Sequence, residues 1–458
     1  MQYGLCMENC HKRNSYFPEL WNAIKDVSAE SLAHGGVTRM IIAMETYYVI
    51  TDPDDIVTVG NFCLEKHFSF GFAKPWLGDG LVTGTESVWK RHRKLINPAF
   101  SLQIIQSFMG VFNATSREMV DSLAKEVNKG PVNASSYFHD NTMKNLSLTA
   151  LGIGTTEEGS TLFQKYMRAV DEILEVIVMR FQNVWLQNNL IYKLSGLKKK
   201  EADLIKVLNN MSDSVSTYQK NGTLTDLEYF CPKYKALLDL LLELSYDCLT
   251  DKEIREEVDT FMVAGTDTSA WLVNYVCCAI GTYPHVQGKM VEELAQTFGD
   301  SDKDVDKQDL QKLVYIEAVI KETLRLYPIV PLSLRTVDSG VKLKNHYLRP
   351  GDHIAMLFYG VNRHAMWGPD ANHFRPERWL EVDSLPKVYG AFGTGKRGCI
   401  GKTFAMTSVK ILLVHLLRHY RIHGDITQLK LKMDFIAKPV SGHHIALTRM
   451  SSGMRKPT

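Results

Sequence analysis

A glycine-rich loop around one cysteine constrains this sequence more than any other feature. Residues 392–401 read FGTGKRGCIG, with glycines on both sides of Cys399. Glycines let the backbone turn tightly and bring amide N–H groups toward the sulfur, where a thiolate needs donors. A helix is expected directly after Gly401, and its N-terminus is expected to lower the pKa of the thiol. The alternative is a plain turn around a buried cysteine, but five fixed positions match by chance only on the order of 10⁻⁴ times per chain of this length.

The spacing of apolar residues predicts a mainly α-helical chain with a small β region. Long helices are expected at 106–129, 160–189, 198–220 and 250–280, where apolar residues recur every three or four positions. Short apolar runs broken by Pro, Gly and Asn indicate an irregular β region over 328–378, with further strands at 38–43, 47–51 and 444–448. Because no repeat or Gly/Ser linker divides the chain, we expect a single domain over residues 1–458.

Composition excludes several classes of protein. The balance of 53 Lys and Arg against 51 Asp and Glu argues against a nucleic-acid binder. The eight cysteines are irregularly spaced, which predicts free thiols in a reducing compartment, and Cys6 and Cys10 lack the second pair that a metal site would need. No run of 18 apolar residues is present, so no segment is predicted to span a bilayer.

The loop at 392–401 fits F-x-x-G-x-R-x-C-x-G and resembles the haem-binding loop of the cytochrome P450 family. The resemblance implies that the Cys399 thiolate is the axial ligand of the iron in haem b. It also implies that Phe392 shields the sulfur, and that Gly401 and Ala405 let the following helix lie close to the flat cofactor.

A second segment, AGTDTS at 264–269, resembles the family's A/G-G-x-D/E-T-T/S motif on the long central helix. These residues are poor helix formers, and Gly265 with back-bonding hydroxyls is expected to open the helix there. By resemblance Ala264 contacts the haem, Thr268 assists the activation of O₂, and Asp267 relays protons to it.

Two further segments resemble the structural core of the family. Residues 321–328, KETLRLYP, resemble the E-x-x-R helix, and residues 374–379, FRPERW, resemble the P-E-R-F/W segment. Glu322 and Arg325 are three residues apart and share a helix face, so that they can pair. The resemblance assigns Glu322, Arg325 and Arg378 a structural role behind the haem.

The haem propionates are expected to be held by a Trp and three arginines. WKRHR at 89–93 resembles the family's W-x-x-x-R helix, and Trp89 and Arg93 lie four apart on one helix face, where both can reach carboxylates. By the same matching, Arg335 and Arg397 complete the propionate site.

The resemblance implies a single-domain cytochrome P450 fold with haem between the long central helix and the cysteine loop. It implies a monooxygenase that inserts one oxygen atom from O₂ into a lipophilic substrate, with electrons from NADPH through NADPH-cytochrome P450 reductase and with cytochrome b5 as a second donor. Lys396, Lys402 and Lys410 are expected to attract the reductase. The substrate pocket is expected to be lined by residues 68–84, 261–264 and 329–334 and by the turn near Val440.

Two alternatives stay open at this point. An isomerase or dehydratase that rearranges peroxides without O₂ would resemble this fold, although such enzymes tend to lack the acid–alcohol pair Asp267–Thr268. The product of a truncated gene could bind haem or lipophiles without catalysis, but every catalytic position is intact.

EEVDTFM at 256–262 resembles the microsomal clan that includes fatty-acid ω-hydroxylases and insect detoxification enzymes. That clan commonly carries a glutamate, which can form an ester with the haem, where this chain has Ala264. We therefore expect no covalent attachment and infer no ω-specificity. Microsomal members begin with a membrane helix and a Pro-rich hinge, and we expect that start to be missing from this sequence. The expected location is the cytosolic face of the endoplasmic reticulum membrane, with peripheral membrane contact; the alternative is mitochondrial, with a ferredoxin partner.

Overall fold

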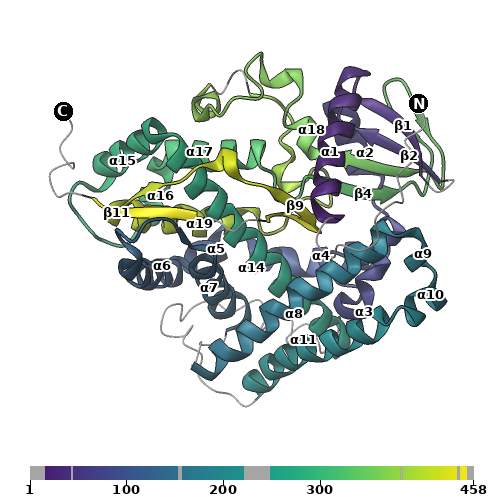
Figure 1. Cartoon of the computed structure of the whole chain (residues 1–458), viewed down its shortest axis with the longest axis horizontal. Coiled ribbons are helices and arrows are strands. Elements are labelled where there is room, and N and C mark those ends of the chain that lie inside the picture. The colour runs from purple at the N-terminus through teal and green to yellow at the C-terminus, as the bar shows by residue number, and fades with distance from the viewer. Residues whose placement is uncertain are drawn as a thin grey trace.

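A long helix, α14 (Asp251–Thr282), passes through the middle of the molecule (Figure 1). A capping box starts it, because the Thr250 side chain accepts from the Glu253 N–H while the Glu253 carboxylate accepts from the Thr250 N–H. The helix is continuous through 264–269 despite its poor helix formers, since buried residues on both sides of this run pack into the core. The predicted opening therefore does not break the helix.

The computed structural model describes residues 16–42, 45–152, 157–220, 248–381, 383, 385–440 and 444–450. Helices pack around α14 and enclose the larger apolar core with it. They are α6 (Met109–Leu123), α7 (Ser135–Leu146), α15 (Pro284–Phe298), α17 (Val314–Leu326) and α19 (Lys402–His419). A second core lies between the first half of α14 and the paired helices α8 (Glu157–Gln182) and α11 (Leu197–Lys220).

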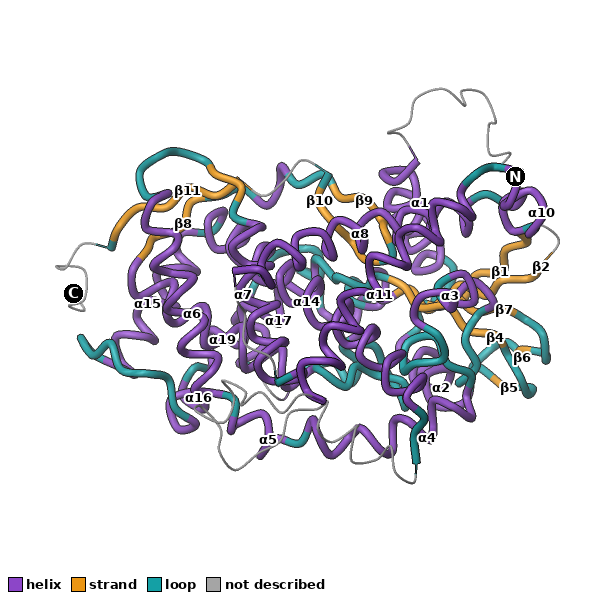
Figure 2. The backbone as a smooth tube through the Cα atoms, turned by 90° about the horizontal axis from the view of Figure 1, so that it is seen from below, coloured by secondary structure: helices purple, strands orange, loops and turns teal. Residues whose placement is uncertain are grey.

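A four-stranded sheet in the order β1-β2-β7-β4 forms one end of the molecule (Figure 2). Its strands are β1 (Val37–Ile42), β2 (Glu45–Ile50), β7 (His353–Leu357) and β4 (Leu332–Thr336). The pairing of β2 with β7 is parallel and the others are antiparallel. Every residue of β7 is buried, as expected for a strand with neighbours on both edges and packed faces.

Three smaller sheets complete the β structure of the described residues, and β8 and β11 lie at the end opposite the large sheet (Figure 2). Their strands are β3 (Val132–Asn133), β8 (Tyr420–His423) and β11 (His444–Arg449), then β9 (Leu431–Asp434) with β10 (Ile436–Pro439), and β5 (Val341–Lys342) with β6 (Tyr347–Leu348). The other described helices are α1 (Tyr16–Ala33), α2 (Pro53–Phe62), α3 (Lys74–Leu77), α4 (Glu86–Ile96), α5 (Leu102–Ser107), α9 (Val184–Gln187), α10 (Asn189–Leu194), α16 (Lys307–Lys312) and α18 (Phe358–Val361). Single turns are η1 (Phe68–Phe72), η2 (Asn97–Phe100), η3 (Ala124–Glu126), η4 (Ser147–Leu151), η5 (Ala365–Trp367), η6 (Pro376–Leu380), η8 (Gly390–Phe392) and η9 (Ile426–Gln428).

The predicted mainly helical class with small sheets is confirmed, but two predicted helices are divided. The segment 106–129 contains the end of α5, α6 and the short turn η3. In the segment 160–189, α8 ends at Gln182 and two short helices, α9 and α10, follow. The side chains of Asn183 and Asn188 cap the N-termini of α9 and α10. Within the described ranges, no helix has the length and apolar character of a membrane span.

The described cysteines are all free thiols. Cys63, Cys277 and Cys278 are buried and Cys248 is exposed, while Cys399 is exposed to a cavity that it lines and is otherwise enclosed by protein. This agrees with the predicted absence of a disulfide framework. Cys6, Cys10 and Cys231 lie outside the described residues.

Candidate active site

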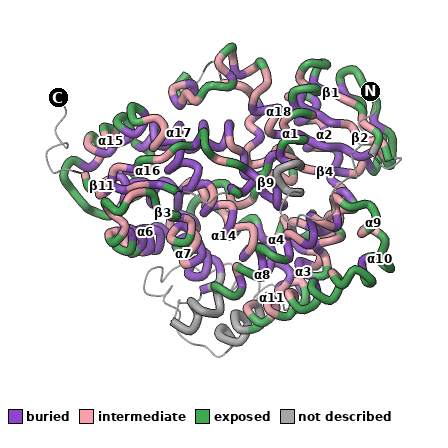
Figure 3. The backbone as a smooth tube through the Cα atoms, in the orientation of Figure 1, coloured by how far each residue is buried: buried purple, intermediate pink, exposed green. Residues whose placement is uncertain are grey.

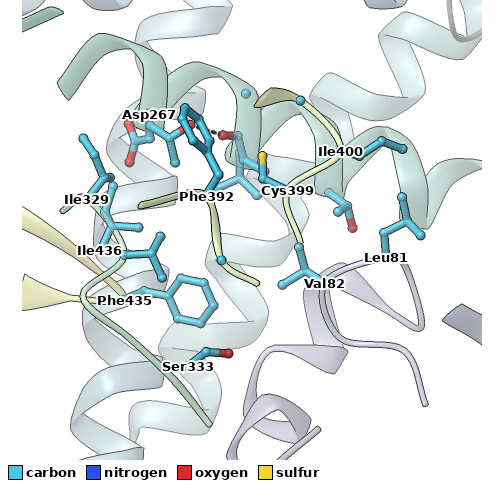
Figure 4. A pocket seen from close by; sticks show the side chains of 18 of the residues that line it. Leu81, Val82, Asp267, Ile329, Ser333, Phe392, Cys399, Ile400, Phe435 and Ile436 are labelled. Carbon is cyan, nitrogen blue, oxygen red and sulfur yellow. Dashed lines mark hydrogen bonds between the residues drawn. The ribbon is translucent and has the colours of Figure 1, made fainter. Parts of the chain in front are cut away.

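One cavity of about 460 Å³ brings together residues that are far apart in the sequence (Figure 4). It lies between α14, β4, the 392–401 loop and the segment before α4. All predicted catalytic and cofactor-binding residues line it: Trp89, Arg93, Ala264, Asp267, Thr268, Arg335, Phe392, Arg397, Cys399, Gly401 and Ala405.

The cysteine loop is fixed by its own backbone and by α2. The Cys399 N–H donates to the Phe392 carbonyl at 2.8 Å, and the Lys396 N–H donates to the Gly60 carbonyl of α2 at 3.1 Å. Gly395 has a φ of +69°, and a Cβ there would overlap the Gly60 carbonyl. Only glycine therefore fits at Gly395, as its left-handed backbone also requires.

The Cys399 thiol has a raised pKa, so the predicted lowering is wrong as a net effect. Burial is the largest cause, and it outweighs the backbone N–H groups of Gly401 and Lys402 and the positive charges of Arg93 and Lys402, which all favour the thiolate. The donors expected from the sequence are present, but they need a further positive charge at the sulfur to keep it ionised.

On α14, Thr268 and Asp267 have different surroundings. The Thr268 Oγ1 donates to the Ala264 carbonyl at 2.6 Å, one turn earlier. The buried Asp267 carboxylate lies 2.9 Å from Lys438 Nζ of β10 and 3.3 Å from His139 Nε2 of α7. Burial alone would raise the pKa of Asp267, but these two groups hold it well below its usual range. The carboxylate is therefore held ionised.

His139 and Lys438 were missed by sequence reasoning because no motif contains them. His139 lies on α7 and Lys438 in the C-terminal hairpin, and the fold brings both to Asp267. Lys438 also pairs with Asp171 of α8 at 2.8 Å. The ion cluster thus joins four elements that are distant in sequence, α7, α8, α14 and β10.

Four positive side chains line one side of the cavity. Arg93 Nη1 donates to the Gly398 carbonyl at 3.0 Å, Arg335 Nη1 to Ser333 Oγ at 2.7 Å, and Arg397 lies 4.7 Å from the Trp89 ring centre. Lys66, which the sequence analysis did not single out, is the fourth. Burial lowers the pKa of Lys66, and it lowers the pKa values of Arg335 and Arg397 to about 10.

These cations fit the two propionates of a haem. Arg397 Nη2 donates to the Gly84 carbonyl, but the buried Nε and Nη1 of Arg397 find no hydrogen-bond acceptor among the described residues. Buried donors without acceptors are costly, and so is a cluster of desolvated like charges. A ligand with two carboxylates would satisfy the free donors and offset the like charges, and the Cys399 sulfur in the same cavity could hold its metal.

Behind the cavity, the structure brings Glu322, Arg325 and Arg378 together. The Glu322 carboxylate accepts from Arg325 Nε at 2.8 Å and from Arg378 Nε at 3.0 Å, and all three side chains are buried. Arg325 Nη1 donates to the Asn362 carbonyl at 2.7 Å, and the Asn362 side chain accepts from the Gly390 N–H at the start of the cysteine loop. The trio is thereby connected to the loop that carries Cys399.

Two sequence-based expectations about the surroundings of the site are wrong. Lys410 is buried, with Nζ 2.9 Å from both Glu317 Oε2 and the Leu310 carbonyl, because the inner face of α19 packs against the core. It therefore offers no surface charge for docking. Val440 does not line the cavity, and residues 441–443 after it lie outside the described residues. The β9–β10 turn lines the cavity through Phe435, whose φ of +61° marks the tight turn.

The other predicted cavity segments do reach the cavity. Residues 68–84 contribute Ser69, Phe70, Ala73, Leu77, Leu81 and Val82, residues 261–264 contribute Phe261, Val263 and Ala264, and residues 329–334 contribute Ile329, Val330, Leu332, Ser333 and Leu334.

A cysteine sulfur and a group of cations that fits two carboxylates, together in one largely apolar cavity, are the features of the haem-thiolate class of protein.

The chain belongs to the cytochrome P450 family, whose model matches residues 15–445. It is 32% identical to mouse cytochrome P450 4V2, over 86% of this chain and 78% of the relative, and 32% identical to human cytochrome P450 4V2, over 88% and 79%. It is also 27% identical to cytochrome P450 4g15 of Drosophila melanogaster, over 94% of this chain and 88% of the relative. These mammalian and insect relatives confirm the clan suggested by residues 256–262, and members of the family are monooxygenases.

Proposed function

We propose that this protein inserts one oxygen atom from O₂ into a lipophilic organic substrate, with electrons from NADPH delivered by NADPH-cytochrome P450 reductase and cytochrome b5 as a second donor. One observation carries the proposal: the axial cysteine, the cation group and the pair Asp267–Thr268 line the same apolar cavity. The family assignment favours this reaction over the isomerase and the non-catalytic alternatives.

Haem b would be held by Cys399 through its iron and by Trp89, Arg93, Arg335 and Arg397 through its propionates. Haem with a thiolate ligand supplies the electron density that favours cleavage of the O–O bond. The Cys399 thiolate, which desolvation disfavours, would gain there the positive charge that its own donors do not supply. Ala264 in place of a glutamate leaves no carboxyl at this position for an ester with the haem.

Asp267 and Thr268 would move protons on the α14 side of the cavity. Burial lowers the pKa of His139, but its hydrogen bond to Asp267 raises it by more, so the imidazole keeps a proton more readily than a free histidine does. The protonated His139 would hold its Nε2 proton against the ionised Asp267 carboxylate, and this pair would supply a proton toward the Thr268 hydroxyl. Lys438 keeps that carboxylate oriented at 2.9 Å.

Oxygen incorporation tests this function. Haem-loaded protein, reductase and NADPH are incubated under ¹⁸O₂ with dodecanoic acid, a sterol, a terpenoid and a xenobiotic as probes. We expect one ¹⁸O atom per product molecule from at least one probe. Product that forms without NADPH or O₂ would contradict the proposal.

Thr268→Ala tests the proton path within the same assay. We expect less product per NADPH consumed, because the hydroxyl that carries the proton is lost. Thr266→Ala is the matched control, since Thr266 contacts Met143 on the buried side of α14. Equal coupling in Thr268→Ala and wild type would remove Thr268 from the path.

The reductase would dock beside the cysteine loop. Lys396 and Lys402 are exposed there, and Lys94 is exposed on α4, whose Arg93 contacts Gly398 of the loop. Positive charges near the haem attract an acidic partner and speed its association. The double variant Lys396→Ala/Lys402→Ala is expected to raise the KM for reductase at low salt, whereas the exposed Lys312→Ala on α16 is not. An unchanged KM in the double variant would place docking elsewhere.

Peripheral contact with the cytosolic face of the endoplasmic reticulum membrane would use α9 and α10, which form an exposed stretch (Figure 3). Trp185 is 64% exposed, Leu190 65% and Leu194 77%, and exposed lysines at 193 and 198–200 flank them. Apolar side chains beside positive charges suit an anionic lipid surface.

Co-sedimentation with phosphatidylserine vesicles tests this contact. Trp185→Ser/Leu194→Ser is expected to weaken binding, and Leu380→Ser on η6 is not, although Leu380 is also exposed. Equal binding of both variants would contradict this surface.

A further inference from the structure

One wall of the cavity is a segment without helix or strand, residues 78–84, which we call the wall loop. It connects α3 to α4 and contributes Leu81 and Val82 to the cavity, on the side near Ile400 (Figure 4). The wall loop has internal hydrogen bonds, from the Thr83 and Gly84 N–H groups to the Gly80 carbonyl, but its position against the cavity is set by contacts with other elements.

Two consecutive carboxylates of α14 accept hydrogen bonds from the backbone of the wall loop. Glu256 Oε2 accepts from the Asp79 N–H at 3.0 Å, and Glu257 Oε2 accepts from the Leu81 N–H at 3.2 Å. Gly78 has a φ of +54°, and a Cβ there would overlap the Glu256 carboxylate. The glycine thus permits the close approach that these hydrogen bonds require.

Glu257 is itself held from α4. Its Oε1 lies 2.6 Å from His92 Nδ1, and neither side chain has any exposed surface. Burial raises the pKa of Glu257, and although burial lowers that of His92, its hydrogen bonds to Glu257 and Glu253 raise it overall, so the pair retains a proton between its two members. His92 Nε2 faces Arg91 at 3.2 Å and Glu253 at 3.4 Å.

The far end of the wall loop is fixed by the cysteine loop, because Arg397 Nη2 donates to the Gly84 carbonyl at 2.9 Å. The wall loop is therefore tied to α14 at Leu81 and to the cysteine loop at Gly84. Both of these elements line the cavity.

We propose that Glu257 is a positioning residue that sets the shape of the substrate cavity by fixing the wall loop through the Leu81 N–H, with His92 holding the carboxylate in place. The proposal rests on the proposed function only in treating this cavity as the substrate site. A buried carboxylate is costly unless it is hydrogen-bonded, and both oxygens of Glu257 form hydrogen bonds with residues outside α14. Without it, Leu81 and Val82 lose their fixed position, and the enzyme discriminates less well among ligands by size and shape.

Glu257→Leu tests the proposal, because leucine keeps a similar volume and cannot accept a hydrogen bond. Glu293→Leu is the matched control, since Glu293 accepts from the Tyr315 and Ile316 N–H groups at 2.6 and 2.9 Å away from the cavity. The first readout is hydrogen exchange at the Leu81 amide. We expect it to be about ten- to a hundredfold faster in Glu257→Leu, the range for a lost hydrogen bond to a charged acceptor, and unchanged in Glu293→Leu.

The second readout is spectral titration of the haem-loaded protein with imidazole and with 1-dodecylimidazole. We expect the long probe to bind about tenfold more weakly to Glu257→Leu, while imidazole binds within twofold of wild type. Faster exchange with unchanged selectivity between the probes would overturn the positioning role, and unchanged exchange would overturn the anchor itself. Failure of the wild-type protein to bind haem would count against the proposed function, while hydrogen exchange at the Leu81 amide would still report on the anchor.

Glu257→Gln provides a second variant if the leucine protein does not fold. The amide oxygen can still accept from Leu81, but a neutral acceptor is about half as strong as a carboxylate. We expect exchange at Leu81 to be about three- to tenfold faster than in wild type. Wild-type exchange and wild-type probe selectivity in Glu257→Gln would contradict the proposal.

Discussion

Removal of the Glu322 carboxylate is expected to destabilise the protein by about 3–5 kcal/mol, because it leaves buried charges without a partner. Glu322 accepts from Arg325 at 2.8 and 2.9 Å and from Arg378 at 3.0 Å, and none of the three side chains is more than 4% exposed. In Glu322→Ala both guanidinium groups stay buried. The Arg375 N–H and the Trp379 Nε1, at 2.9 and 3.0 Å, lose their acceptor as well.

Urea unfolding of the haem-loaded protein, followed by far-UV circular dichroism, measures this loss. With a slope on the order of 3 kcal/mol per M for a chain of this size, the midpoint should fall by about 1 M or more. Glu377→Ala is the control, because Glu377 lies in η6 beside Arg378 but pairs with the exposed Lys289 at 2.6 Å and with Tyr315 at 2.8 Å. Such partly exposed contacts are worth about 1 kcal/mol or less.

The reasoning would be refuted by a Glu322→Ala midpoint no lower than that of Glu377→Ala. That result would mean that water or a shifted side chain compensates the two guanidinium groups, and that the trio does not support the cysteine loop.

Two further predictions concern the loops on either side of the cavity. Gly395→Ala is expected to lower the free energy of unfolding by more than about 2 kcal/mol and to lower haem content, because its Cβ would overlap the Gly60 carbonyl at a positive φ. Gly71→Ala is the control, since no atom lies near its Cβ, and it should change neither quantity. Normal haem content in Gly395→Ala would contradict this view of the loop. Burial raises the pKa of Asp434, next to the cavity-lining Phe435, from 3.8 to about 6, so the stability that protonation gives is fully present below about pH 4 and is lost as the pH rises through 6. Asp434→Asn should therefore be more stable than wild type at pH 7.5, by up to about 3 kcal/mol, and the difference should vanish near pH 4; a difference independent of pH would contradict this.

The parts of the site that lie within short sequence windows could be predicted. Cys399, its glycines and the pair Asp267–Thr268 occupy single loops or helix turns, so the resemblance of these short motifs to a family was enough to predict that they share one site, and they line one cavity. The long helix α14 was predictable for the same reason, since a capping box and regular apolar spacing mark it.

Contacts between distant segments could not be predicted. His92 and Glu257 are 165 residues apart, and the partners of Asp267 come from α7 and β10. No local pattern marks such a histidine or lysine as different from a surface residue. Lys410 was wrongly predicted to be a surface charge for docking, because it lies close to the cysteine loop in the sequence. Only the packing of α19 shows that it is buried and pairs with Glu317.

The pKa of Cys399 shows why a local rule can give the wrong sign. The helix N-terminus and the nearby cations favour the thiolate, as the sequence suggests, but the degree of burial is a property of the whole fold and outweighs them. The groups that favour the thiolate can be predicted from the sequence, but the cost of desolvating the sulfur cannot.

The difference spectrum of the dithionite-reduced, haem-loaded protein with and without carbon monoxide tests thiolate ligation by Cys399 most directly. A strongly red-shifted Soret band is expected in wild type and in Cys277→Ser, whose buried thiol lies in the core, and it should be lost in Cys399→Ser. A band at the shorter wavelength of a haem with a neutral ligand in the wild-type protein, or an unchanged red-shifted band in Cys399→Ser, would contradict the assignment of Cys399 as the thiolate that holds the haem.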